Sequence, residues 1–224
     1  MTVLIWKAIY RGWQAALLLL ITSCGGNAVL PADSVVIERL AAAREIHAIH
    51  FAAPSLGYQS PETTSPLPTM GPGHPKFIEN IGLENPSDAL KSSFLALWKD
   101  KFPSPTVSPN PEPFPYRDLR ELRTKYSPDL FLEFGTDRWL FGGSFSEGPF
   151  LHVQYEAHTY LTDSVTGKIL WRGHCFASKD LAEENTGKRL TLKDLMASDW
   201  KPLKSAWKEA THVCAREMVT QFSS

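Results

Sequence analysis

The fold of this chain is decided by residues 151–176, which read LHVQYEAHTYLTDSVTGKILWRGHCF. In the first half of this stretch, apolar and polar side chains alternate from one residue to the next. Side chains of a β-strand point alternately to its two faces. The alternation therefore predicts a strand with one face on a core and the other toward water or a partner. The predicted core-facing side chains are Leu151, Val153, Tyr155, Ala157, Thr159 and Leu161.

A tight turn is predicted directly after this strand, because residues 163–168 read DSVTGK. Gly167 can take the left-handed backbone conformation that such turns use. The segment from Ile169 to Phe176 then returns as the hairpin partner. Upstream, residues 130–135 also alternate and predict a neighbouring strand, so the central third of the chain is expected to form three antiparallel strands.

Helices are predicted before and after these strands in the chain, in residues 86–102, 116–126 and 199–222. In each segment the apolar residues fall on one side of the helix. Ser87 is the expected N-cap of the first helix, since its hydroxyl can accept from a backbone N–H of the first turn. A short helical turn to residue 197 is expected to begin at Thr191, with Asp194 at the third position. The predicted buried stripe of the last helix is Leu203, Trp207, Ala210, Cys214 and Met218.

The remaining segments complete a single predicted domain over residues 34–224. A helical turn is expected within residues 34–45 and a strand at 46–52, followed by proline-rich inserts at 53–82 and 103–115. One further short strand is allowed for between the first two long helices. This order predicts an α+β fold, with a mixed or antiparallel sheet and helices packed mainly on one face.

The amino-terminal region has the features of a secretory signal. Lys7 and Arg11 precede a short apolar run, which small residues follow. The run is too short for a membrane-spanning helix. Its end, ITSC at residues 21–24, resembles the lipobox of bacterial lipoproteins. The resemblance implies a signal peptide at 1–23, thioether lipidation of Cys24 and acylation, as with palmitate, of the new amino terminus.

Two other interpretations of this region stay open: an ordinary cleaved signal peptide, and an anchor or core helix. Under the lipoprotein interpretation, residues 24–33 form a tether and the lipid on Cys24 is the membrane anchor. The residue after the cysteine is Gly25 and not Asp, the residue that the familiar lipoprotein sorting rule associates with the inner membrane. This predicts a cell-envelope protein in the outer membrane that faces the periplasm, with the inner membrane as the alternative.

The charge of the chain gives no reason to expect a nucleic-acid partner. Its formal net charge is −1. Removing residues 1–23 removes Lys7 and Arg11 and no acidic residue, so the remaining chain is more acidic still. Nucleic-acid binding needs a clustered basic face, and the sequence shows none.

The three cysteines predict one disulfide. If Cys24 carries lipid, Cys175 and Cys214 remain as a pair in an oxidising compartment. A bond between them would join a strand to the last helix and stabilise the fold by about 3–4 kcal/mol in the chain-entropy model. The alternative is a reactive thiol or a redox pair, although the spacing is not that of a CxxC motif.

Two short motifs resemble a known kind of envelope domain. YSPDLFL at 126–132 and LTDSVTGKILW at 161–171 are similar to segments of the amino-terminal domain of the Tol–Pal translocation protein and of the curli secretion-channel lipoproteins. The resemblance covers roughly residues 86–222 and implies an assembly or scaffold domain rather than an enzyme. The proline-rich inserts depart from those families, so pore formation is not implied.

No motif for catalysis, a metal or a cofactor stands out. The seven histidines lack the spacing of an HxxxH or CxxC metal frame. GGSFSEG at 142–148 fits a hairpin loop better than the strand-to-helix turn of a serine hydrolase. Nearby aromatic residues either pack in the core or form an exposed patch for a protein partner or the membrane interface. They are Trp139, Phe141, Phe145 and Phe150.

The sequence thus predicts a lipid-anchored, periplasm-facing protein that works as a non-catalytic interaction or assembly component. Its partners are expected to be the membrane, through Cys24, and an envelope protein or a second copy of the chain. The alternative is a small envelope enzyme or ligand-binding protein, with residues 53–82 as a lid over the sheet.

Overall fold

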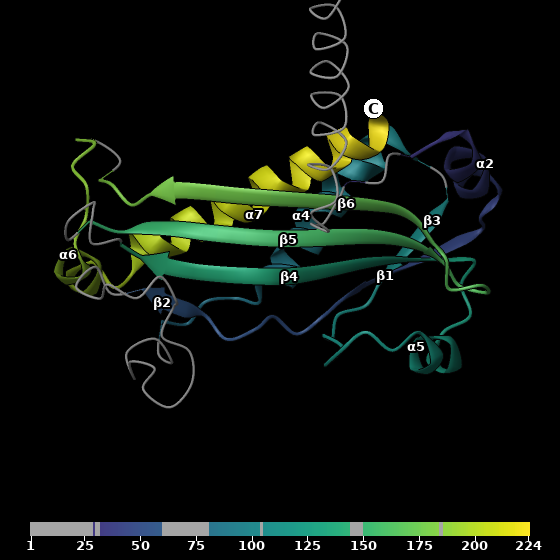
Figure 1. The fold of residues 1–224 in the computed structure, drawn as a ribbon, viewed down its shortest axis with the longest axis horizontal. Coiled ribbons are helices and arrows are strands. Elements are labelled where there is room, and N and C mark those ends of the chain that lie inside the picture. The colour runs from purple at the N-terminus through teal and green to yellow at the C-terminus, as the bar shows by residue number, and fades with distance from the viewer. Residues whose placement is uncertain (1–28, 30–31, 60–80, 104, 144–149, 184–185) are drawn as a thin grey trace, which may run out of the picture.

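The computed structural model of the protein describes residues 29, 32–59, 81–103, 105–143, 150–183 and 186–224. Within them the chain forms an α+β fold around one mixed sheet (Figure 1). The strands are β1 (Glu45–His50), β2 (Gly57–Gln59), β3 (Thr106–Pro109), β4 (Leu130–Gly142), β5 (His152–Asp163) and β6 (Ile169–Asp180). The helices are α2 (Ser34–Ala42), α4 (Pro86–Lys101), α5 (Leu119–Lys125), α6 (Leu192–Ala197) and α7 (Lys201–Ser223).

The predicted antiparallel unit is confirmed, since β4, β5 and β6 pair in that order. The core-facing residues named for β5 are all buried. At the turn between β5 and β6, Gly167 has a φ of +76°, as predicted. Asp163 holds this turn, because its Oδ1 accepts from the backbone N–H groups of Val165 and Thr166 at 3.0 and 2.8 Å.

Parallel strands form the other half of the sheet. The order is β3-β1-β4-β5-β6, with β1 parallel to both β3 and β4. The short strand β2 pairs with the far end of β4, also in parallel. The sequence did not predict β2, which lies inside the insert at 53–82. The short strand allowed for between the helices is present as β3, inside the second proline-rich segment.

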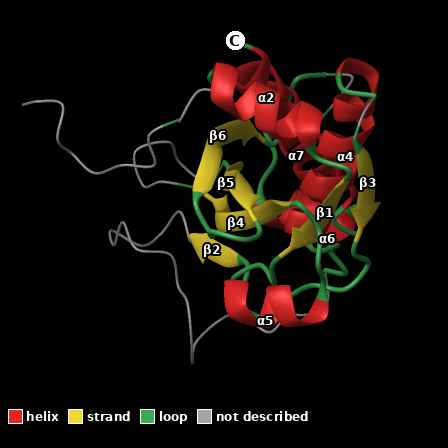
Figure 2. Ribbon diagram, turned by 90° about the vertical axis from the view of Figure 1, so that its right-hand side faces the viewer, coloured by secondary structure: helices red, strands yellow, loops and turns green. Residues whose placement is uncertain are grey.

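Helices α4 and α7 cover one face of the sheet, and in Figure 1 both pass behind β4, β5 and β6. The main core lies between them and the sheet, with Leu90, Phe94 and Trp98 of α4 against Trp171 and Phe222. Figure 2 shows the same stacking from the side. The predicted buried stripe of α7 is confirmed, because all five of its residues are buried. The prediction that α7 begins at Asp199 is two residues early.

Helix α5 lies on the opposite face, where it covers a smaller core of Ile49, Phe51, Phe114, Leu122 and Phe131. The topology explains this position. The path from β1 through α4 to β3 and the path from β3 through α5 back to β4 run in opposite directions across the sheet. Crossovers between parallel strands have one hand, so the returning connection passes over the opposite face.

Local capping follows the prediction at α6 and departs from it at α4. Thr191 and Asp194 form the predicted capping box. At α4 the prediction that Ser87 is the N-cap is wrong. Asn85 Oδ1 accepts from the Ser87 backbone N–H at 2.9 Å, and Pro86 fills the first helical position. Ser87 Oγ instead lies 2.8 Å from Thr136 Oγ1, in the buried contact between α4 and β4.

Candidate binding groove between α4 and α7

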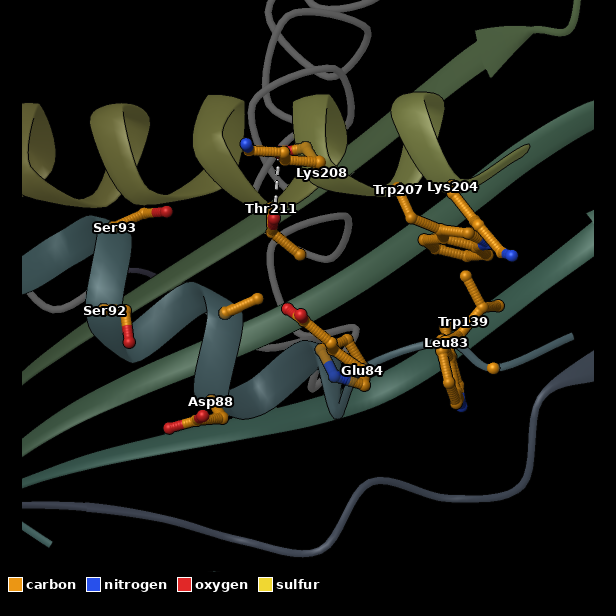
Figure 3. Close-up of a pocket in the computed structure, with 13 residues that line it drawn as sticks. Leu83, Glu84, Asp88, Ser92, Ser93, Trp139, Lys204, Trp207, Lys208 and Thr211 are labelled. Carbon is orange, nitrogen blue, oxygen red and sulfur yellow. Dashed lines mark hydrogen bonds between the residues drawn. The ribbon is translucent and has the colours of Figure 1, made fainter. Parts of the chain in front are cut away.

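A groove of about 440 Å³ lies between the N-terminal halves of α4 and α7 and ends at Trp139 of β4 (Figure 3). We call it the α4–α7 groove. Its lining residues are Gly82, Leu83, Glu84, Pro86, Asp88, Ala89, Ser92, Ser93, Trp139, Lys204, Trp207, Lys208 and Thr211. Its volume lies within the ~300–1,000 Å³ range of small-molecule sites.

The α7 wall combines an indole with two lysines. Lys204, Trp207, Lys208 and Thr211 line the groove together because residues three, four and seven apart share one face of a helix. Trp207 is only 5% exposed. Among the described residues, its Nε1 has no hydrogen-bond partner. A buried donor without a partner is costly. The Nε1 atoms of Trp98 and Trp171 are in the same state, but of the three rings only Trp207 lines the groove.

Two indoles make the apolar end of the groove. The rings of Trp139 and Trp207 meet edge to face, with centroids 5.5 Å apart. Trp139 Nε1 donates to the carbonyl oxygen of Pro54, and this bond ties the ring to the segment before β2. Tyr155 packs edge-on against Trp207 from the sheet, with its centroid at 6.1 Å. These contacts hold the two rings in place.

The opposite wall is the start of α4 and the loop before it. Figure 3 shows the Glu84 carboxylate directed from that loop into the groove and the Asp88 carboxylate directed away from α7. Asp88 is already paired, since its Oδ1 lies 2.8 Å from Lys91 Nζ. Glu84 is therefore the acidic lining residue without an ion pair among the described residues.

A buried polar cluster lies behind this wall. Lys91 is 4% exposed, and its Nζ donates to His50 Nδ1 at 3.0 Å and to the carbonyl oxygen of Asn110. Burial lowers the pKa of His50, Lys91 lowers it further, and Asp88 opposes the change. Neutral His50 is thus the acceptor for Lys91. The cluster fastens α4 to β1 and to the segment after β3, and this fixes the α4 wall.

The free charges of the groove are mainly positive. Lys208 makes no ion pair with any described residue, and Lys204 Nζ lies 3.8 Å from the exposed Asp199. Exposed pairs at such distances are weak. The groove therefore offers two ammonium groups and the hydroxyls of Ser92 and Ser93, against one unpaired carboxylate, that of Glu84. The unpaired indole N–H of Trp207 is covered and lies just beneath this surface. Donors outnumber acceptors in it.

The predicted site residues are found in different places. Cys24 lies outside the described residues. Cys175 on β6 and Cys214 on α7 are joined by a disulfide, with an S–S distance of 2.06 Å. Their pairing bridges the sheet and the helix that covers it, as the sequence predicted.

The exposed aromatic patch is not present as proposed. Phe141 is fully buried, because it points to the α7 side of β4 and meets Trp200 edge-on at 6.1 Å. Trp139 and Phe150 are half-buried, the latter beneath the Arg189 guanidinium at 4.9 Å. Phe145 lies outside the described residues. Of the two alternatives, core packing is therefore correct for Phe141, whereas Trp139 lines the α4–α7 groove.

Two histidines that lie close together on the sheet contact different carboxylates. His158 and His174 lie opposite each other on β5 and β6. However, His158 Nδ1 is 2.8 Å from Asp137 Oδ1, while His174 Nε2 is 3.2 Å from Glu156 Oε1. Within the described ranges, no group of three or more His, Cys, Asp or Glu side chains could hold a metal ion. The serines of the GxSxG-like loop lie outside those ranges.

Sequence reasoning missed the α4–α7 groove. Trp207 was identified only as a core residue, and Lys204, Lys208 and Glu84 were not singled out. The available signal was the pair of lysines at i and i+4 on either side of a tryptophan on one helix face. That signal could not reveal that α4 and α7 separate at this end of the helices.

In the part of the chain that is described, no helix has the length and apolarity to span a membrane.

Comparisons with known proteins return only distant structural likenesses. No protein-family model matches the chain, and no curated protein matches it. Protein XCC0632 from Xanthomonas campestris, of family DUF330, matches 81% of this chain and 86% of its own, at 10% identity and a TM-score of 0.44. Lipoprotein GNA1162 from Neisseria meningitidis matches 69% and 92%, at 15% identity and 0.37. The PelC dodecamer of Paraburkholderia phytofirmans matches 85% and 94%, at 12% identity and 0.36. At these TM-scores no conclusion about function follows.

Proposed function

We propose that this protein is a lipid-anchored component of the cell envelope that faces the periplasm and acts by binding, without catalysis. The observation that carries the proposal is the start of the chain. Lys7 and Arg11 precede a short apolar run that ends in ITSC at 21–24, which is the pattern of a signal peptide cut before a lipidated cysteine. Stable anchoring needs more than one acyl chain, and a diacylglyceryl thioether with an acylated amino terminus supplies it.

The described fold is compatible with this proposal in two respects. The Cys175–Cys214 disulfide suits an oxidising compartment. The α4–α7 groove is lined by lysines, hydroxyls and indoles that could hold a ligand or a partner. The similarity of residues 126–132 and 161–171 to envelope assembly domains supports a scaffold role. The lid suggested at 53–82 lies largely outside the described residues and adds nothing to the proposal.

The anchor is tested by the intact mass of the protein extracted from membranes. The wild-type chain is expected to begin at Cys24 and to carry the added mass of its acyl chains. The Cys24→Ala variant should lack that mass and leave the membrane fraction, while Asn27→Ala in the tether should behave like the wild type. An unlipidated wild-type protein, or a Cys24→Ala variant that stays with the membrane, would contradict the proposal.

The membrane is tested by gradient separation of inner and outer membranes. The wild-type protein is expected in the outer-membrane fraction, because Gly25 and not Asp follows the lipidated cysteine. Gly25→Asp is expected to hold it at the inner membrane. Chemical crosslinking before extraction in mild detergent then tests the interaction role, and the absence of any crosslinked envelope protein or second copy counts against it.

A further inference from the structure

We propose that the α4–α7 groove binds a small organic monoanion, a carboxylate with an aromatic or apolar body. The proposal does not depend on the lipid anchor, because every residue that carries it lies in the described domain. Three observations lead to it: an unpaired buried donor, an excess of positive charge, and an apolar end formed by two indoles.

The unpaired donor is the indole N–H of Trp207. The ring is held from two sides, by Trp139 and by Tyr155, so it cannot simply turn its N–H toward water. Among the described residues nothing accepts from Nε1. Figure 3 shows Lys204 beside the Trp207 ring, one turn earlier on the helix. Lys204 is long and only partly buried, and a shift of its side chain would let a ligand oxygen reach both donors.

The charge of the groove selects a monoanion. Lys204 and Lys208 bring two positive charges to the α7 wall, and Asp88 is neutralised by Lys91 at 2.8 Å. Glu84 directs one negative charge into the same space (Figure 3). A single carboxylate on the ligand balances the remaining positive charge. For a dianion, the attraction of the lysines and the repulsion of Glu84 both double. The cost of removing the ligand from water rises about fourfold, because it scales with the square of the charge, so the monoanion is favoured.

The indole end selects an apolar or aromatic body. Trp139 and Trp207 already meet edge to face, and aromatic rings favour such offset or edge contacts. Leu83 and Ala89 extend this apolar surface along the α4 side. A volume of about 440 Å³ accommodates a two-ring molecule.

The test uses the full-length chain in a non-ionic detergent, with its indole ¹H–¹⁵N signals recorded by NMR. Trp207→Phe identifies the Trp207 signal by its loss. The probes are 2-naphthoate, 2-naphthyl phosphate and the neutral 2-naphthamide. Addition of 2-naphthoate is expected to move the Trp207 proton downfield, because it gains an acceptor, with half-saturation on the order of 0.1–1 mM. The phosphate should bind more weakly, and the amide at least about tenfold more weakly.

Charge variants separate specific binding from partition into the detergent. Lys204→Gln and Lys208→Gln are each expected to weaken 2-naphthoate binding about threefold, and Glu84→Gln to strengthen it by a similar factor. Lys201→Gln, an exposed lysine on the same helix outside the groove, should change nothing.

The proposal is overturned if 2-naphthoate does not change the chemical shift of the Trp207 indole proton. It is also overturned if 2-naphthamide binds as tightly as 2-naphthoate. It is also overturned if Lys204→Gln, Lys208→Gln and Lys201→Gln behave alike. Tighter binding of 2-naphthyl phosphate than of 2-naphthoate would overturn the assignment of a monoanion.

Discussion

At the scale of single residues, Lys91 shows how a charged side chain can be part of a core. It lies on α4 next to Leu90, and its ammonium reaches three partners from separate segments: Asp88, His50 and the carbonyl of Asn110. Glu133 is a second case, because its carboxylate is fully buried and receives Arg117 Nε at 2.6 Å. Such groups are tolerated because each is paired, and removing one partner costs more than the pair itself contributes.

Replacement of Lys91 tests this argument. Lys91→Met is expected to lower the free energy of unfolding by about 2 kcal/mol, because the His50 ring and the Asn110 carbonyl lose their donor inside the protein. Urea unfolding followed by tryptophan fluorescence measures the change. Lys99→Met, at an exposed position of the same helix, should change it by less than about 0.5 kcal/mol. Equal effects of the two substitutions would contradict the stabilising role of the buried contacts of Lys91.

At the scale of elements, one covalent bond joins the sheet to a helix, and one strand pairing adds β2 to the sheet. The disulfide joins β6 to α7 across 39 residues of chain. At one end of the sheet, β2 pairs with the last residues of β4, where Gly142 has a φ of +152°. A Cβ at Gly142 would lie 2.0 Å from the carbonyl oxygen of Gln59. The close approach of these two backbones therefore requires a glycine.

The disulfide is expected to contribute about 3–4 kcal/mol to the free energy of unfolding, by restricting the unfolded chain. The double variant Cys175→Ala/Cys214→Ala should show this loss in urea unfolding. Reductant should lower the stability of the wild type by a similar amount and leave the variant unchanged. A wild-type protein with two free thiols at Cys175 and Cys214 before reduction would contradict the bond.

The β2–β4 contact is tested by Gly142→Ala, which is expected to cost about 2–3 kcal/mol and to release β2 from the sheet. Gly82→Ala is the matched control. Gly82 also has a positive φ, +66°, but nothing lies within 4 Å of its added Cβ, so only the backbone cost of about 1 kcal/mol is expected. Amide hydrogen exchange at residues 57–59 should rise in the first variant and not in the second.

At the scale of the whole molecule, the histidines and aspartates with shifted pKa values all make the folded protein less stable in acid. The pKa values of His47 and His50 are lowered from 6.5, mainly by burial. The pKa values of Asp129 and Asp194 are lowered from 3.8 by hydrogen bonds from the backbone. For Asp163, burial acts to raise the pKa, but hydrogen bonds from Thr166 and Arg39 outweigh it and the net change is downward.

Stability is therefore expected to fall in two steps as the pH is lowered. Below pH 6.5 the unfolded chain protonates the two histidines before the folded protein does, so the free energy of unfolding decreases. Below about pH 4 the aspartates lose the stabilisation that their charged forms receive. Urea unfolding between pH 7.5 and 3 measures both steps. The double variant His47→Gln/His50→Gln should lose the first step and keep the second, and an unchanged first step would show that other groups cause it.

The sequence by itself determined the local structure. The alternation at 151–161, the Gly167 turn, the Thr191–Asp194 capping box and the buried stripe of α7 all follow from spacing along the chain. The two-residue and 3.6-residue periods of apolar residues depend only on residues near each other in the chain. They are therefore the same however the elements are arranged in space. The α+β class followed from the order of these elements, and the signal-like start needs no fold to be recognised.

Only the tertiary structure decided most contacts between segments far apart in the chain. It added β2 to the sheet, sent α5 to the opposite face, buried Phe141 and enclosed Lys91 and Glu133. It also opened the α4–α7 groove, where Glu84, Trp139 and Trp207 come together from positions up to 123 residues apart. Such contacts depend on the crossover hand, strand register and the angle between two helices. None of these is written in a local period, so the groove became visible only in the folded chain.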